Sequence, residues 1–466
     1  MNPLKKLASQ TAIYGLSSVV GRLLNYLLVP LYTRYFLPAE YGVVTELYAY
    51  VAFLVVMLTY GMETAFFRFS KKEETTKVYS TTLISLLISS VIFIGLIFLN
   101  SSEISQWLGY ANHPEYIQFF ALIIGMDAVA SISFAKLREQ DKAMRFAFIR
   151  IVNIMVNIGL NLYFIVYQEY GIAYIFIANL VASVITLLML FPQMISSSWV
   201  FDKKLWKKMM IYALPLLIAG LAGMTNETID RILLKHLLPN TDMAASELGL
   251  YGAFYKLSII MILFIQTFRF AAEPFFFAQE KEGNSRKIYA DVMKYFTIIM
   301  AIIFLGVTIF YDVIKGFLGS EYHDERGFLV VSILLLANLF LGIYYNLSIW
   351  YKLTEKTKYG AYLSIFGAII TLSLNFTLIP VLGFVGCAWA TLVCYFSMTV
   401  ASYYLGKRHF SVPYQVKRIA LYLFGMLCIY FCIYFTNLNM WINSLFLLGF
   451  VIFVYRLEKP KLALKL

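Results

Sequence analysis

Charged residues stand deep inside long apolar stretches of this sequence, where ionisable side chains are costly and usually serve a function. Arg22, Lys256 and Asp127 each lie about ten residues from either end of such a stretch, which is too deep for a side chain to reach the headgroups easily. A cation in this position forms charge-assisted hydrogen bonds with carboxylate or phosphate oxygens. The chemistry that the residues indicate is therefore the binding of an anionic group.

Polar stripes accompany these charges. The residues around Arg22 follow spacings of four, four and three, which is typical of one helix face. Lipid cannot hydrogen-bond such a stripe, so it must face protein or water. It is either glue between helices or the lining of a water-filled cavity, and the cavity is favoured. The two stripes are Tyr14, Ser18, Arg22 and Asn25, and Arg150, Asn153, Asn157 and Asn161.

Two interpretations of Arg22 remain open, since it either lines a cationic cavity or pairs with Asp127 to fix helix packing. Basic residues nearer the ends of the stretches have a simpler explanation, because their side chains can reach the headgroups. Those residues are Arg150, Arg269 and Lys294.

A further pair lies near the outer end of its stretch, where Glu227 and Arg231 are four residues apart. At this spacing two opposite charges can pair along one helix face.

The elements that carry these residues are predicted from composition. The chain has 466 residues, of which 61% are hydrophobic and 14% charged, whereas soluble domains have roughly 45–50% and about 25%. A spanning helix needs about 20 apolar residues, and no cleavage site for a signal peptide follows the first stretch. An all-α integral membrane protein with about fourteen transmembrane helices is therefore expected. The stretches are 11–33, 41–67, 78–99, 117–136, 146–167, 171–193, 208–236, 247–271, 288–310, 327–350, 359–379, 383–404, 418–435 and 440–456.

The net charge of +12 lies mostly on one side of the predicted membrane. When basic residues at the ends of the stretches are counted with the adjoining loops, four of the 38 Lys and Arg residues fall in the outer loops and six deeper within the stretches, so 28 remain for the cytoplasmic side. This bias predicts an even number of helices with both termini cytoplasmic. The chain has no Lys/Arg-rich arm or zinc spacing, so no nucleic-acid partner is predicted.

A weak internal repeat organises the helices. "KLREQDK" at 136–142 corresponds to "KLTEKTK" at 352–358, and "GIA" at 171–173 corresponds to "GCA" at 386–388. The offsets of 216 and 215 imply a unit of about six helices, and an even number makes the repeat parallel. We expect two six-helix lobes around a central cavity and two additional helices. The predicted parts are 1–200, 201–410 and 411–466.

Other kinds of site find little support. The four histidines lie in loops or at helix ends without an acid/base constellation, and no Walker-type glycine loop is present. The sequence predicts no catalytic residue, no metal site and no cofactor. The four cysteines fall in apolar stretches and are interpreted as packing residues; they are Cys387, Cys394, Cys428 and Cys432.

Three longer motifs resemble a known family. The chain resembles the polysaccharide biosynthesis (O-antigen and capsule flippase) family of the multidrug/oligosaccharidyl-lipid/polysaccharide exporter superfamily. The motifs are "GRLLNYLLVPLYTRYFLPAEYGVVTELYAY", "DRILLKHLLPNTDMAASELGLYGAFYKLSIIMILFIQTFRFAAEPFF" and "LNFTLIPVLGFVGCAWATLVCY".

The resemblance implies alternating access through a V-shaped cavity in the bacterial inner membrane. The implied substrate is an undecaprenyl-diphosphate-linked oligosaccharide moved to the outer leaflet, with membrane lipids and polymerases or glycosyltransferases as partners. Arg22 matches the family's helix 1 arginine, and Lys256 and Arg269 correspond to basic residues on helix 8. The predicted binding set is Arg22, Lys256, Arg269, Arg150, Arg231, Asn25 and Asn157, and the candidates for coupling to Na+ or H+ are Asp127, Glu46 and Glu63.

Two alternatives remain. An ion-coupled multidrug or cation antiporter of the same superfamily would usually place acidic residues in the cavity, and the depth of Arg22 and Lys256 argues against a cationic cargo. A membrane-embedded glycan polymerase would elongate or release glycan, whereas a flippase changes no covalent bond.

Overall fold

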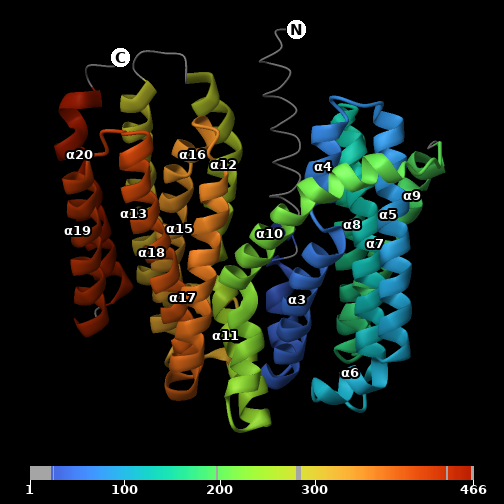
Figure 1. Ribbon diagram of the computed structural model, residues 1–466. Helices are drawn as coiled ribbons and strands as arrows, with labels where there is room; N and C mark the ends of the chain where they lie inside the picture. The colour runs from blue at the N-terminus through green and yellow to red at the C-terminus, as the bar shows by residue number, and fades with distance from the viewer. Residues whose placement is uncertain (1–22, 25, 196–197, 280–284, 437–438, 463–466) are drawn as a thin grey trace. The chain divides into compact units, whose positions relative to one another are not determined.

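The computed structural model describes residues 23–24, 26–195, 198–279, 285–436 and 439–462. Within these ranges the secondary structure consists of helices joined by short connections, with no strand (Figure 1). The chain divides into two compact units, Met1–Gly249 and Leu250–Leu466. We refer to them as unit 1 and unit 2.

Unit 1 contains the helices from α2 to α10 and the first half of α11. Helix α5 packs on α7, α7 on α9, and α9 on α8. The bounds are α2 (Leu28–Tyr35), α3 (Pro38–Thr59), α4 (Met62–Phe69), α5 (Thr75–Leu99), α6 (Ser101–Trp107), α7 (Pro114–Glu139), α8 (Ala143–Asn161), α9 (Ala173–Ile195), α10 (Lys203–Leu237) and α11 (Thr241–Leu257).

Unit 2 is built around α15, α17 and α18, with α13 between α15 and α19. The bounds are α12 (Ile259–Gln279), α13 (Ser285–Ile309), α14 (Tyr311–Lys315), α15 (Gly327–Leu347), α16 (Ile349–Leu353), α17 (Lys358–Leu382), α18 (Phe384–His409), α19 (Val416–Thr436) and α20 (Met440–Leu462).

Thirteen helices in the described part of the chain are long and apolar enough to cross a membrane. They correspond in order to the second to fourteenth predicted stretches, so the prediction of an all-α multi-pass membrane protein is confirmed. Most of the first stretch, 11–33, lies outside the described residues, and α2 is its described end. The prediction that both termini are cytoplasmic stays a prediction. So does the division at residues 200 and 410, although α10 packs on α3, α4 and α5 of unit 1.

Two predicted helices are interrupted. The stretch 41–67 breaks at Tyr60 and Gly61, which both have positive φ. A Cβ on Gly61 would lie 2.9 Å from the carbonyl oxygen of Ala213 on α10, so glycine permits both the bend and the close helix crossing. The stretch 247–271 breaks at Ser258, between α11 and α12. A regular hydropathy pattern continues across both breaks, and for this reason the sequence predicts single helices there.

Helix α10 begins at a well-formed cap. The carboxylate of Asp202 accepts hydrogen bonds from the N–H groups of Lys204 and Leu205, which satisfies donors that a helix start leaves free. The Lys77 ammonium, 2.7 Å from Asp202, together with these N–H groups holds the pKa of Asp202 down at about 2. The first turns then bury their apolar face in the unit 1 core, through Leu205 and Met209.

The last two helices are fastened to α13 by a buried ion pair. Lys294 has no exposed surface, and its Nζ lies 2.6 Å from Oε2 of Glu458 on α20. Arg418 and Tyr422 of α19 hydrogen-bond the other carboxylate oxygen, at 2.9 and 2.6 Å. The position of Lys294 in the sequence suggests that its side chain reaches the headgroups. In the structure it pairs instead with a carboxylate 164 residues further along the chain.

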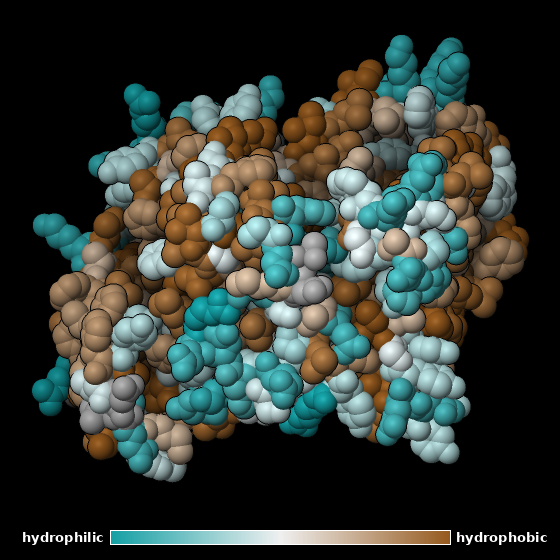
Figure 2. Space-filling view, turned by 90° about the horizontal axis from the view of Figure 1, so that it is seen from below, coloured by the Kyte–Doolittle hydropathy of each residue, from teal (hydrophilic) through white to brown (hydrophobic). Residues whose placement is uncertain are grey.

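The surface has the character of membrane helices. Large apolar side chains are exposed along most long helices, whereas Figure 2, which looks onto the helix ends, shows hydrophilic and hydrophobic residues mixed. Such a distribution fits helices whose sides contact lipid and whose ends carry polar connections.

Candidate functional site

Helix α8 of unit 1 has two faces of opposite character. One face exposes apolar side chains at intervals of three or four residues, as a lipid-facing surface does. The other carries the predicted polar stripe. The exposed apolar residues are Met144, Phe148, Ile151 and Met155, and the polar ones are Arg150, Asn153, Asn157 and Asn161.

Arg150 is exposed, although Phe146 and Ile154, one turn before and after it, are buried. Its guanidinium lies 4.2 Å from the ring centroid of Phe134 on α7 and 5.7 Å from that of Phe146. Cation–π contacts of this kind hold the flat guanidinium in place while its N–H donors remain free for other partners. The charge of Arg150 thus stands within a membrane helix on the side away from its apolar surface.

Asp127 lies on α7 and shares this environment. The hydroxyl of the buried Ser183 on α9 donates to its Oδ1 at 3.0 Å, and the side chain is otherwise exposed between buried neighbours. The carboxylate is also close enough to Arg150 for the two charges to interact. We call Asp127, Arg150, Asn153 and Asn157 the unit 1 polar face.

Arg138, at the end of α7, extends this face toward one end of unit 1. Its guanidinium lies 6.0 Å from the Phe146 ring, so that two arginines lie near Phe146. Arg138 forms a short ion pair with Glu63 of α4, and both charges act on Arg150. The Nε of Arg138 is buried and has no hydrogen-bond partner among the described residues. The sequence does not single out Arg138, because it lies in a loop-like run of charges and only the packing of α8 brings it to Arg150.

The asparagines of the stripe serve mainly as links between helices. Asn153 donates to Thr186 of α9 at 2.9 Å. Asn161 is fully buried and accepts a hydrogen bond from the Tyr32 hydroxyl at 2.9 Å, while its own amide donates to Asn157. The stripe therefore combines both interpretations, since its asparagines join helices and Arg150 remains exposed.

Two other predicted residues of unit 1 lie elsewhere. Glu46 is fully buried and pairs with Lys235 at 2.7 Å. Arg231 is largely buried, and its guanidinium donates to the backbone carbonyl of Glu227 at 3.2 Å. The predicted contact between Glu227 and Arg231 thus involves a backbone oxygen of Glu227 and not its carboxylate. Neither Glu46 nor Arg231 contributes to the unit 1 polar face.

The predicted cations of unit 2 are described separately. Lys256 lies two residues before the break at Ser258 and is half-buried. The Arg269 guanidinium lies 4.0 Å from the Tyr345 ring, and its Nε is 3.7 Å from Glu273, which also binds Lys352. Arg22 and Asn25 lie outside the described residues.

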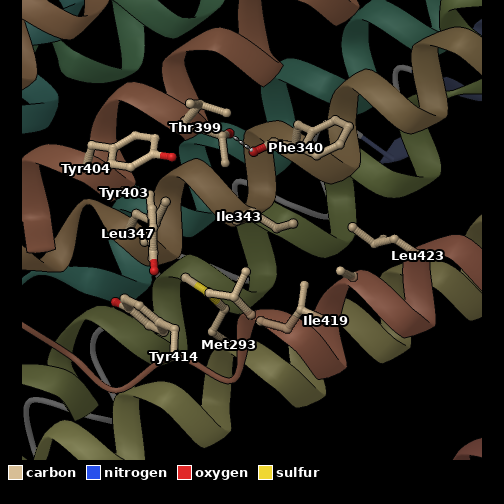
Figure 3. A pocket seen from close by; sticks show the side chains of 13 residues that line it. Met293, Phe340, Ile343, Leu347, Thr399, Tyr403, Tyr404, Tyr414, Ile419 and Leu423 are labelled. Atoms are coloured by element: carbon tan, nitrogen blue, oxygen red, sulfur yellow. Dashed lines mark hydrogen bonds between the residues drawn. The ribbon is translucent and has the colours of Figure 1, made fainter.

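Unit 2 also contains an apolar groove of about 300 Å³ (Figure 3). It lies between α13, α15, α18 and α19, and the Thr399 hydroxyl within it donates to the carbonyl of Phe340 at 2.8 Å. No charged side chain lines this groove, so an anionic group has no counterion there. No cluster of three or more metal-ligating side chains occurs in the described ranges.

Solved structures of other proteins have a similar fold. The chain is similar to the lipid II flippase MurJ in an inward closed conformation, with a TM-score of 0.76 and 16% identity over 96% of this chain and 99% of that one. It is also similar to a multidrug resistance MATE family transporter of the MOP superfamily in an inward-facing conformation, with a TM-score of 0.68 and 14% identity over 85% and 94%. At these identities the likeness shows the fold alone.

Comparison with curated proteins finds no significant sequence match. A family model does match: that of the polysaccharide biosynthesis proteins, over residues 31–327. This range covers more than half of the chain, including α3 to α14 and the whole unit 1 polar face. The resemblance inferred from the three sequence motifs is confirmed, and the chain belongs to the polysaccharide biosynthesis protein family.

Proposed function

We propose that the chain is a flippase that moves an undecaprenyl-diphosphate-linked oligosaccharide from the cytoplasmic to the outer leaflet, for cell-surface polysaccharide such as O-antigen or capsule. The observation that carries the proposal is Arg150, an exposed guanidinium within a membrane helix of a member of this family. The MurJ-like fold adds support, because that protein is itself a lipid II flippase.

The arginines of unit 1 offer the chemistry that a diphosphate needs. A guanidinium binds two phosphate oxygens at once through parallel hydrogen bonds, and Arg150 and Arg138 both lie near the ring of Phe146. In our proposal Glu63 balances the charge of Arg138 when no substrate is bound. The headgroup exchanges its hydration for these hydrogen bonds, while the polyprenyl tail stays in lipid. Rocking of one lobe against the other then carries the headgroup across.

The remaining predicted residues complete the proposal. Arg22, Lys256, Arg269 and Arg231 are further cations for the diphosphate, with Asn25 and Asn157 as hydrogen-bonding partners. Coupling to Na+ or H+ is assigned to Asp127, Glu46 or Glu63. Of these three, Asp127 is preferred as the residue that couples the binding of the ion to that of the substrate, because it shares the unit 1 polar face with Arg150.

In the proposed activity, the protein changes no covalent bond of its substrate and acts in the bacterial inner membrane. Polysaccharide polymerases and glycosyltransferases are its proposed partners. Recovery of the lipid-linked oligosaccharide unchanged after transport would separate this activity from that of a glycan polymerase.

The test is transport by the purified chain in proteoliposomes that contain a labelled undecaprenyl-diphosphate oligosaccharide. Transport is read as protection of the sugar from a glycosidase that cannot cross the membrane. We expect Arg150→Ala to lower the rate roughly tenfold or more, because about 1.5–3 kcal/mol of charged hydrogen bonding is lost. Arg150→Lys should retain part of the rate, because the two-pronged geometry is lost but the charge remains. Arg22→Ala should behave like Arg150→Ala.

The matched control is Arg145→Ala, which removes an arginine from the same helix whose guanidinium contacts Gln193 at 3.4 Å. Wild-type transport by Arg150→Ala, or equal losses in the Arg150 and Arg145 variants, would overturn the proposal. Melting temperatures of all variants show whether a loss of transport reflects misfolding.

A second candidate function is a multidrug or cation antiporter. Asp127 favours it, because an exposed carboxylate within a membrane helix could bind a cation or proton, and MATE transporters have a similar fold. Export of cationic dyes that depends on Asp127 and not on Arg150 would favour this function over the first.

A further inference from the structure

A second group of charged side chains lies in unit 1, at the end where α6 is found (Figure 1). It joins α3, the turn after α6 and the end of α10. Glu46 of α3 is at its centre and is completely buried. One carboxylate oxygen, Oε2, accepts hydrogen bonds from Lys235 at 2.7 Å and from the Tyr110 hydroxyl. Lys235 is fixed in turn, since it also donates to the carbonyl of Leu108 at 2.6 Å.

The other carboxylate oxygen of Glu46 is incompletely satisfied. Oε1 is buried and accepts no hydrogen bond from the residues that the structure describes, a situation that is unfavourable, most of all for a charged group. A candidate donor is Nε2 of His236 on α10, which lies 3.8 Å from this oxygen. This distance is about 1 Å longer than a hydrogen bond between charged groups.

His236 is placed so that it can respond to a proton. Its side chain is 34% exposed, so water can reach it. Its Nε2 lies 3.1 Å from the Tyr50 hydroxyl, and its ring stacks on Trp107 with centroids 5.7 Å apart. The titratable or charged groups around the pair are thus Glu46 and Tyr50 from α3, Tyr110 from the turn after α6, and Lys235 from α10.

We propose that His236 and Glu46 form a proton-operated latch between α10 and α3. When His236 takes up a proton from water, Nε2–H turns toward Oε1 of Glu46 and the Tyr50 hydroxyl no longer donates to Nε2. The buried oxygen is then paired, and two cationic residues of α10 hold Glu46 instead of one. When His236 is neutral, the Tyr50 hydroxyl donates to Nε2 and Lys235 alone holds the carboxylate. No other group gains or loses a proton in this step.

The latch is expected to close as the pH falls through the range in which histidine becomes charged, between about pH 8 and about pH 5. The cationic form of His236 gains a buried partner only in the folded chain, so acid should tighten the contact between α10 and α3. This inference does not depend on the proposed transport function, because it concerns a contact within unit 1.

The test is hydrogen–deuterium exchange of the purified full-length chain at about pH 5.5 and about pH 8, corrected for the intrinsic pH dependence of exchange. Peptides from the middle of α3 and the end of α10 should exchange roughly fivefold more slowly at the lower pH, which corresponds to about 1 kcal/mol. His236→Gln should abolish this difference. His236→Lys should show slow exchange at both pH values, because its charge is permanent.

The matched control is His113→Gln. His113 lies at the same end of unit 1 and bonds Glu115 at 2.8 Å, but that pair is exposed and does not involve α10. A pH response that persists in His236→Gln, or that disappears in His113→Gln, would overturn the proposal. Glu46→Gln gives an independent check, since it should remove the pH response while His236 is intact.

Discussion

At the scale of single residues, position along a helix does not decide what a polar side chain does. Arg150 and Asn161 lie on the same stripe of α8, yet Arg150 is exposed and Asn161 is buried against Tyr32. Glu46 and Asp127 are both acids within membrane helices, but Glu46 is enclosed by Lys235 and Tyr110. Exposed groups can meet a substrate without first leaving a buried environment, so Arg150 and Asp127 are the residues of unit 1 to test first.

The pair of Lys294 and Glu458 allows a stability prediction at this scale. Lys294→Met removes one partner from a completely buried ion pair and leaves Glu458 with Arg418 and Tyr422. We expect the free energy of unfolding to fall by about 3 kcal/mol, as when one partner of a buried pair is lost. Thermal unfolding in detergent would measure the effect.

The double variant Lys294→Met with Glu458→Gln should lose less stability than the sum of the two single variants, because it leaves neither charge of the pair behind without its partner. Lys287→Met is the control, since Lys287 lies on the same helix and is exposed. Additive losses in the double variant would show that the two side chains do not stabilise each other.

At the scale of helices, the interruptions are as informative as the helices. Helix α3 ends at residues in the left-handed conformation, where α10 crosses close to Gly61. Helix α8 ends in a π-helical turn over Leu162–Tyr167, a feature that often marks functional positions in α-helices. Such breaks bring side chains of neighbouring helices together. The ion pair between Glu63 on α4 and Arg138 on α7 lies just beyond the break at Gly61.

Gly61→Ala should weaken this crossing. Its φ of 72° costs a residue with a Cβ roughly 1–2 kcal/mol, and the added Cβ would crowd the carbonyl oxygen of Ala213. We expect a lower melting temperature in detergent. Gly95→Ala, on α5, is the control, because its Cβ would meet no atom within 4 Å and alanine favours the helix. Equal melting temperatures for the two variants would contradict this account of the break.

At the scale of the whole molecule, the distribution of charge predicts orientation. Basic residues concentrate in alternate connections, and such connections stay on the cytoplasmic side. In intact cells, a maleimide that cannot cross the membrane should label Glu103→Cys, on α6, and leave Lys356→Cys, between α16 and α17, unlabelled. Both positions are exposed. Replacing Cys428 and Cys432 by serine removes the native cysteines that are not buried. The reverse labelling pattern would place the termini outside.

The sequence by itself determined the membrane class, the position of thirteen of the helices and the family. Hydropathy, charge bias and motifs can be recognised in the chain without knowledge of how its helices pack. It also singled out Arg150 and Asp127, because a charge within an apolar stretch is visible in one dimension.

Only the tertiary structure decided which partner each charge has. Lys294 meets Glu458, Glu46 meets Lys235, and Arg138 comes beside Arg150 across gaps in the sequence that no spacing rule covers. Charges act through space, and in a bundle the distance between two side chains depends on how the helices cross. The same cause explains the broken helices, since a bend at Gly61 or Ser258 follows from local backbone geometry that hydropathy does not record.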